Sequence, residues 1–438
     1  MSEKILIRSG QVIDGLGNEP RIADLLITGN RIDRVGENLT TADTTRVIDA
    51  AGCTVMPGLI DTHCHISFDE PSSNDELFFH RNREGLAAII AAANVVKLLR
   101  AGVTGFLDAD SLFEVGVDLR DAIEAGIVLG PRMATGGNAL LTAAGGTAGR
   151  LIPEEGLIGY GKVVGDRDDI VREVRRQIKR GVDWIKVHVT GLTPRQKTVG
   201  EQQVWSLAEL KLVTETAHEL GVPVIGHCRG ASSVRDSALA GFDMILHATH
   251  MDEEALSAVV EKQVPIVPTF TFQANLADYG ASIQASPELQ ELFRKEIKDS
   301  ASMLRRAHEA GVPLLCGTES GFSLTPYGEW HYRELEVFVR ELGFSTIEAI
   351  KAATSEAARG LCMYGETGAL TEGLLADVIV VRGAVDQDVT LLAEPGHIER
   401  VILNGELLEL PAPSPRDDPP GWRVSHYGKG ILRREDIK

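Results

Sequence analysis

Cysteine is scarce in this chain of 438 residues. The five cysteines are scattered, and none is followed by another cysteine at Cys-x-x-Cys spacing. This odd, unpaired set is typical of reduced thiols, so we expect a cytoplasmic protein without a disulfide framework. The first eight residues also lack the basic and apolar regions of a signal peptide, which agrees with that expectation.

Basic residues and long apolar runs are also few. The chain has 44 Lys and Arg against 63 Asp and Glu, a formal net charge of −19. A nucleic acid or an anionic membrane would need a basic face, so we expect neither as a partner. No run approaches the ~18–20 apolar residues of a membrane span. We expect a small-molecule substrate as the partner. The acidic charge does not indicate which one.

The two ends of the chain share one sequence pattern, that of short strands separated by turns. Residues 1–57 hold short strand candidates broken by Gly and Asn turns, and strand candidates return after residue 365. We expect a small flanking β-sandwich domain built from residues 1–57 and 365–412. The tail, 413–438, is rich in Pro and charge, and we expect an arm that lies over the body or over a neighbouring subunit.

Between these ends, residues 58–364 alternate strand candidates with helical stretches. Gly follows several helix ends and precedes a β-branched residue, as in Ala101-Gly102-Val103, which is the usual helix-to-strand joint. Eight alternations predict an α/β fold, a (β/α)8 TIM barrel. A doubly wound sheet is the alternative, but no GxGxxG follows an early strand. The predicted strands are 59–65, 103–108, 132–137, 184–190, 222–228, 243–247, 264–269 and 312–317. The predicted helices are 84–101, 111–125, 166–180, 206–220, 231–240, 252–262, 287–310, 331–342 and 345–360.

Side chains able to bind metal lie at the ends of these strands. His63 and His65 are two apart, so on a strand they project to the same side. Active-site groups of such barrels lie at the C-terminal ends of the strands, which brings distant residues together. Any one of these residues alone could have a purely structural role, but their joint occurrence at the ends of several strands is hard to obtain by accident. The set is His63, His65, Lys186, His227, His247 and Glu319.

The chemistry of this set points to divalent metal ions. Imidazoles suit Zn²⁺ or a related ion, whereas the ammonium of Lys186 would be useless there. After CO2 adds to the amine, a lysine carbamate has two oxygens that bridge two metals. Such metals share a water molecule, lower its pKa and polarise a carbonyl, and the carboxylate of Glu319 accepts the proton.

The motifs around these residues resemble those of the amidohydrolase superfamily. The most similar branch is the binuclear one of imidazolonepropionase-like and Xaa-Pro-dipeptidase-like hydrolases. The resemblance covers about residues 1–410 and is carried by 55–65, 181–186, 226–227, 240–247, 317–321, 348–354 and 368–377. It implies the barrel with a flanking β-sandwich, two divalent ions, most simply Zn²⁺, and self-association into a homo-oligomer.

The resemblance also implies a role for each ligand. His63 and His65 would bind the buried metal, His227 and His247 the outer one, and carboxylated Lys186 would bridge both. At the last strand the family has Asp, whereas this chain has Glu319, whose extra methylene moves the carboxylate by roughly 1.5 Å. Glu319 then performs the Asp role, binds metal differently, or weakens activity.

The loop after the third barrel strand departs from the family pattern as well. Relatives often carry His after the Gly-Gly pair, where this chain has Thr147. The glycines of residues 135–147 still predict a mobile loop over the mouth of the barrel.

The same comparison separates hydrolysis from deamination. Mononuclear deaminases of the superfamily have Glu three residues after the fifth-strand His, and here that position is Gly230. We therefore predict attack of a metal-bridging hydroxide on an amide-type C–N bond, with Glu319 and Lys186 as the catalytic pair. A relative that has lost its metal and serves as an assembly protein is the non-catalytic alternative, but it would lack several of these ligands.

Three further residues are candidates for substrate binding. Arg229 lies two past a ligand and would grip a carboxylate, which favours an N-acyl amino acid or a dipeptide. The alternative is that Arg229 pairs with a local acid such as Asp252 or Glu253, and the substrate is a neutral carbamate or urea. His188 and His250 are additional polar groups near the mouth.

Overall fold

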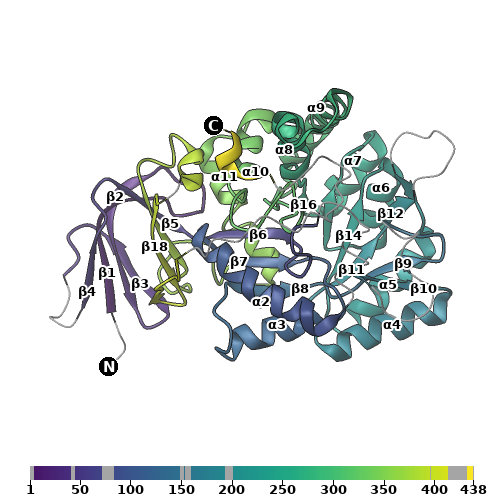
Figure 1. The fold of residues 1–438 in the computed structure, drawn as a ribbon, viewed down its shortest axis with the longest axis horizontal. Helices are drawn as coiled ribbons and strands as arrows, with labels where there is room; N and C mark the ends of the chain where they lie inside the picture. Colours follow the sequence, from purple (N-terminus) through teal and green to yellow (C-terminus); the bar gives the residue numbers. More distant parts are fainter. Residues whose placement is uncertain are drawn as a thin grey trace.

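The two ends of the chain meet in one sheet. The computed structural model describes residues 4–40, 45–71, 83–147, 152, 159–192, 201–394, 396–412 and 432–437. Eight strands from both ends pair in the order β19-β18-β17-β5-β1-β2-β3, with β4 on β1. The C-terminal β17 pairs antiparallel with the N-terminal β5, and β18 lies among the purple N-terminal strands in Figure 1. These strands are β1 (Lys4–Val12), β2 (Arg21–Thr28), β3 (Arg31–Gly36), β4 (Arg46–Asp49), β5 (Cys53–Pro57), β17 (Val378–Arg382), β18 (Ile398–Leu403) and β19 (Glu406–Leu407).

The middle of the chain builds two parallel sheets, which confirms the predicted α/β class. One sheet has the order β6-β7-β8 and the other β10-β9-β11-β14-β15-β16. Their nearly continuous apolar runs fit strands that are covered on both faces. Figure 1 shows helices packed around them. The strands are β6 (Leu59–Cys64), β7 (Val103–Asp108), β8 (Arg132–Thr135), β9 (Ala139–Thr142), β10 (Gly161–Val164), β11 (Ile185–His188), β14 (Val224–Cys228), β15 (Met244–His247) and β16 (Ile266–Val267).

Backbone hydrogen bonds join these sheets to one another. Trp184, just before β11, donates its N–H to Thr135 at the end of β8 (3.1 Å). The segment 312–317, predicted as a strand, forms only an isolated bridge, between Leu314 and Ile266. Pro313 has no N–H to donate in this segment, which limits its pairing. The segment still lies between β16 and β6, because Leu315 donates to Ile266 (2.9 Å) and Thr62 donates to Cys316 (3.1 Å).

Seven helices match the predicted stretches within a few residues. Local signals set their ends: the side chain of Asp166 caps α4, and Gly181 ends it in the left-handed conformation at φ 98°. These helices are α2 (Glu84–Arg100), α3 (Val115–Glu124), α4 (Arg167–Arg180), α5 (Leu207–His218), α6 (Ala231–Ala240), α7 (Glu253–Lys262) and α9 (Pro287–Glu309).

The remaining helices are shorter or were not predicted. We missed α8 (Thr271–Tyr279) because its residues from Thr271 to Ala277 are all buried, so it shows no polar face. The stretch predicted at 331–342 is α10 (Arg333–Val337) followed by a π-helical turn, η3 (Phe338–Leu342). The stretch predicted at 345–360 is divided into α11 (Thr346–Ala352) and the 3-10 turn η4 (Ala357–Leu361). Elsewhere lie the hairpin β12 (Thr190–Leu192) and β13 (Gln202–Gln203) and the 3-10 turns η2 (Gly280–Ile283), η5 (Val389–Ala393) and η6 (Arg434–Ile437).

None of the helices in the described ranges combines the length and apolar character needed to cross a bilayer. Most of the predicted C-terminal arm, residues 413–431, lies outside the described residues.

Candidate active site and metal centre

The His-x-His pair lies at the end of β6 with its ring nitrogens oriented by outer partners. The rings of His63 and His65 are 5.0 Å apart, and both side chains are buried. Nδ1 of His63 lies 3.0 Å from Oγ1 of Thr269, whose hydroxyl donates to the carbonyl of Val267. Nδ1 of His65 lies 3.3 Å from the carbonyl of Asp110. Because these partners accept, each Nδ1 carries the proton and each Nε2 keeps a lone pair for a metal.

His227 and His247 bring a second pair to the same place. They lie on the neighbouring strands β14 and β15, their rings are 4.5 Å apart, and the ring of His247 is 5.2 Å from that of His63. Within the described ranges, neither ring nitrogen of the buried His247 has a hydrogen-bond partner. A buried imidazole with both nitrogens unpartnered is costly, and a metal ion would satisfy it.

Lys186 is fully buried on β11, beside β14. Its Nζ lies 3.2 Å from Oδ1 of Asp110, but among the described residues it makes no hydrogen bond of good geometry. Asp110 also lies 2.9 Å from Nε2 of His188. Burial alone would raise the pKa of Asp110, yet Lys186 and His188 hold that pKa well below its usual value. Sequence reasoning missed Asp110, although it follows the predicted strand 103–108 at the end where active-site groups gather.

Glu319 reaches the first pair of histidines despite its departure from the family pattern. Ligand atoms of His63, His65 and Glu319 all lie within 4.8 Å of one another. The backbone N–H of Glu319 donates to the carbonyl of His63 at 2.6 Å, and its φ of 58° is uncommon outside Gly. Burial raises the pKa of Glu319 to about 7, although Arg229 and Lys186 oppose this shift.

The four imidazoles are held neutral by their surroundings. Burial lowers the pKa of His65 to about 4, and it lowers those of His63 and His247 well below the usual value and that of His227 more modestly. Neutral imidazole is the form that binds metal. The unpartnered nitrogens of His247, the neutral rings and the nearby carboxylate therefore fit a divalent cation.

Glu201, which sequence reasoning missed, and Thr147 lie against the ring of His227. Oε2 of Glu201 lies 2.8 Å from Nε2 of His227 and accepts from Thr190 at 2.8 Å. Burial alone would raise the pKa of Glu201, but His227 lowers this pKa to about 2. Thr147, which occupies the place of a family histidine, lies 3.3 Å from the same nitrogen. No motif marked Glu201, which lies just before the two-residue strand β13.

The three predicted substrate-binding residues have different surroundings. Arg229 forms an ion pair with Glu296 of α9. The local acids are engaged elsewhere, since Asp252 caps α7 and Glu253 pairs with Arg306. The ring of His188 lies 5.1 Å from that of His227, inside the cluster. His250 is half-buried, and no hydrogen bond or ion pair between described residues joins it to the cluster.

Aromatic side chains cover one side of the cluster. Phe68 stacks on His65 with 4.5 Å between ring centroids, and Phe322 meets His65 edge-on at 5.5 Å. Phe272 packs on Phe322 at 5.9 Å. Phe68 and Phe272 are buried, whereas Phe322 is half-buried, three residues after Glu319. An apolar surface therefore borders the carboxylate.

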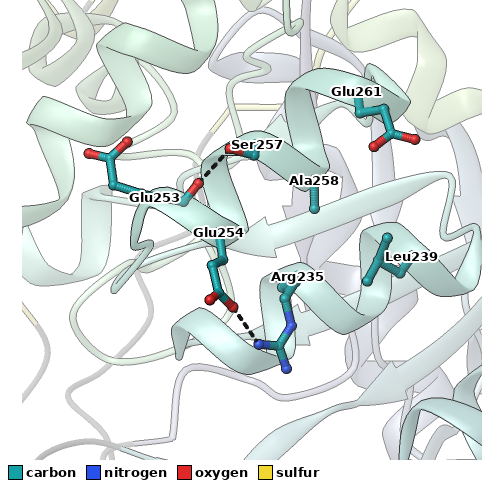
Figure 2. A pocket seen from close by; sticks show the side chains of 7 residues that line it. All are labelled: Arg235, Leu239, Glu253, Glu254, Ser257, Ala258 and Glu261. Atoms are coloured by element: carbon teal, nitrogen blue, oxygen red, sulfur yellow. Dashed lines mark hydrogen bonds and ion pairs between the residues drawn. The ribbon is translucent and has the colours of Figure 1, made fainter.

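A separate groove lies on the outside of the molecule, between α6 and α7. Figure 2 shows its lining, in which Arg235 forms an ion pair with Glu254 at 2.9 Å. The other lining residues are Leu239, Glu253, Ser257, Ala258 and Glu261. None of the candidate site residues lines this groove, so we do not assign it to the active site.

Comparison with known proteins identifies the class. The model of the amidohydrolase family matches residues 54–408, so the chain belongs to this family, and it is a hydrolase that acts on C–N bonds. The predicted resemblance is thereby confirmed.

Three similar proteins cover nearly the whole chain. The ochratoxinase of Aspergillus niger is 28% identical over 437 residues, which span 94% of this chain and 88% of that protein. Its crystal structure has a TM-score of 0.80 and covers 93% of this chain and 95% of that one. The imidazolonepropionase of Symbiobacterium thermophilum is 24% identical over 402 residues, 86% of each chain. The crystal structure of a Xaa-Pro dipeptidase with bound methionine has a TM-score of 0.80, is 28% identical, and covers 93% of this chain and 100% of that one.

Proposed function

We propose that this protein hydrolyses the amide bond of an N-acyl amino acid or a dipeptide in a metal-dependent reaction. The observation that carries the proposal is the convergence of His63, His65, His227, His247 and Lys186, with both ring nitrogens of buried His247 unpartnered among described residues. The proposed architecture is a closed (β/α)8 barrel. It is supported by the bonds of 312–317 to both β16 and β6 and by the bond from Trp184 to Thr135.

Two divalent ions, most simply Zn²⁺, fit this donor set. His63 and His65 would hold one, His227 and His247 the other, and a carbamate on Lys186 would bridge them. When bound, such ions polarise a carbonyl and lower the pKa of water. As an ammonium, the fully buried Lys186 would have the carboxylate of Asp110 at 3.2 Å but no hydrogen bond of good geometry among the described residues, which compensates a buried charge poorly.

The side chains of the chain itself would orient the reactants and move the proton. Glu319 would take a proton from the attacking water on its carboxylate and pass it to the leaving nitrogen. Its ligand atoms lie within 4.8 Å of those of His63 and His65, which supports this placement. Glu201 would orient His227, to which it is 2.8 Å away, as outer partners of metal-binding histidines do.

Two arguments support an amino acid as one half of the substrate. The Xaa-Pro dipeptidase structure at 28% identity holds methionine in its active site, and the A. niger relative is an ochratoxinase. Phe322, half-buried beside Glu319 and packed on Phe272, offers an apolar surface for the acyl group or for an apolar side chain.

A neutral carbamate or urea is the second candidate substrate. The observation that favours it is the ion pair of Arg229 with Glu296, which gives the guanidinium a structural partner. In that case no substrate carboxylate is needed to balance its charge.

A substrate screen with zinc-loaded protein tests the proposal. We would measure metal per chain, and then release of free amino acid from N-acyl amino acids and dipeptides, beside a matched set of carbamates and ureas. The expected result is bound zinc and turnover of the amino-acid amides, with loss of both in Lys186→Met. Turnover of carbamates or ureas alone would replace the first substrate class by the second, and a metal content far below one ion per chain would contradict both.

A further inference from the structure

A buried carboxylate lies directly behind the His-x-His pair. Asp61 is on β6, two residues before His63, where the pairing of β6 with β7 shifts register between Asp61 and Cys64. Asp61 is only 4% exposed. A carboxylate so far from water needs hydrogen-bond donors on both oxygens.

Asp61 has four such donors. Its Oδ1 accepts from the backbone N–H of His63 (3.1 Å) and from that of Thr318 (3.0 Å). Its Oδ2 accepts from the hydroxyl of Thr318 (2.5 Å) and from Nδ1 of His331 (2.7 Å). The donors come from three separate parts of the chain, so one carboxylate joins β6, the turn at 318 and the segment before α10.

Two of these parts carry candidate catalytic groups. Thr318 precedes Glu319 directly, and the N–H of Glu319 donates to the carbonyl of His63 at 2.6 Å. Together with the bonds to Asp61, this fixes the turn that carries Glu319 against the strand that carries His63. The spacing between an expected metal ligand and the expected proton carrier therefore depends on Asp61.

His331 in turn orients Asp61. Its Nε2 accepts from the backbone N–H of Gly328 at 3.1 Å, so its proton is on Nδ1 and points to Asp61. His331 is 5% exposed. Ligand atoms of Asp61, Cys64 and His331 are close enough to hold a metal ion, but both nitrogens of His331 are already engaged. The cluster is thus a hydrogen-bonded support and not a further metal site.

We propose that Asp61 is a positioning residue, oriented by His331, that sets the placement of His63 and Glu319. The inference rests on the proposed function only in taking His63 as a ligand and Glu319 as the proton carrier. An amide at this position turns one acceptor into a donor that faces other donors, which would loosen both segments. Loss of such an outer partner typically costs about 10–100-fold in metal affinity or activity.

The test compares Asp61→Asn, His331→Phe, Thr318→Val and the conservative Thr318→Ser. We would measure zinc affinity by competition with a chromophoric chelator, kcat and KM on a substrate from the screen, and unfolding of the metal-free proteins. Asp61→Asn and Thr318→Val should lower zinc affinity or kcat by about 10–100-fold with little change in KM, and Thr318→Ser should retain wild-type values. The double variant Asp61→Asn with His331→Phe should be little worse than Asp61→Asn alone, because both act through one bond.

Wild-type zinc affinity and kcat in Asp61→Asn and Thr318→Val would overturn the inference, as would additive effects in the double variant. If Asp61→Asn does not fold, Thr318→Val and His331→Phe decide by the same criteria. If the wild type binds zinc but hydrolyses no compound in the screen, the substrate proposal fails and the zinc affinities alone decide on Asp61. If the wild type binds no zinc, both proposals are overturned.

Discussion

Arg229, which directly follows β14 and lies two residues after the candidate ligand His227, forms an ion pair with Glu296 of α9. The pair ties the mouth of the candidate site to a helix that lies 67 residues further along the chain. The ion pair is compatible with two roles for Arg229: a substrate anchor held in place by Glu296, or a purely structural cation. The two roles predict different effects of substituting Arg229.

Arg229→Met should raise KM for N-acyl amino acids by about 10–100-fold, because a charge-assisted hydrogen bond is worth about 1.5–3 kcal/mol. Amides of similar size that lack a carboxylate should be hydrolysed as before. Glu296→Gln keeps the cation and should change KM less. Steady-state kinetics on the matched substrates check this. Equal losses on substrates with and without the carboxylate would assign Arg229 the structural role.

His247→Asn should lower the zinc content of the purified protein, because His247 is buried and its ring nitrogens have no other partner among the described residues. The matched control is His250→Asn, three residues on, which is half-buried and is not joined to the cluster. We expect the control to retain wild-type zinc. Metal analysis of the dialysed proteins checks both, and equal zinc in the two variants would remove His247 from the ligand set.

The sequence predicted which candidate ligands come together, but it did not predict the residues that hydrogen-bond to them. His63, Lys186, His227 and His247 could be found because parallel strands bring their C-terminal ends together, whatever their separation in the chain. Thr269, which orients His63, could not be found because its effect depends on a left-handed backbone at φ 59°, which no motif marks. Glu201 reaches His227 from the position just before a strand of two residues, which is too short for a period-2 pattern to be recognised.

The same limit applies to the fold. Helix ends at 166–181 were predictable because Asp166 and Gly181 act locally, through a side-chain cap and a left-handed residue. The helix α8 was not predictable, because tertiary packing buries it from Thr271 to Ala277 and removes the polar face that periodicity requires. Local signals are visible in one sequence, whereas burial by distant segments is not.

Asp108→Asn should change how stability depends on pH. Asp108 is fully buried, its Oδ1 accepts from Ile66 at 2.9 Å, and its Oδ2 has no partner among the described residues. Burial raises its pKa to about 8, well above the usual value of an aspartate, and Asp110 adds to the shift while Lys186 opposes it. The folded state therefore binds more protons than the unfolded state from about pH 4 to pH 8, and this contribution to stability falls as pH rises through that range.

Urea unfolding of metal-free wild type and Asp108→Asn at pH 5, 7 and 9 measures this effect. The free energy of unfolding of the wild type, minus that of the variant, should decrease as pH rises and then level off above pH 8. A difference that stays constant across this range would show that Asp108 is ionised in both states.

Leu432→Ala should destabilise the protein, because this C-terminal residue is packed into the body and not merely laid on it. Leu432 is fully buried, its N–H donates to Ser323 at 3.0 Å, and its carbonyl accepts from Nε1 of Trp330 at 3.2 Å. The next residue, Arg433, forms ion pairs with Glu329 at 2.7 Å and with buried Glu70 at 3.4 Å. Truncating a buried Leu to Ala costs about 2–5 kcal/mol.

The matched control for this prediction is Leu292→Ala on α9, where the side chain is 54% exposed. A surface substitution of this kind should change the free energy of unfolding by no more than about 0.5 kcal/mol. Urea unfolding of both variants makes the comparison. Losses of equal size would mean that Leu432 is not part of the core in solution, and that the segment from Leu432 to Ile437 does not hold the loops at Glu70 and Glu329 together.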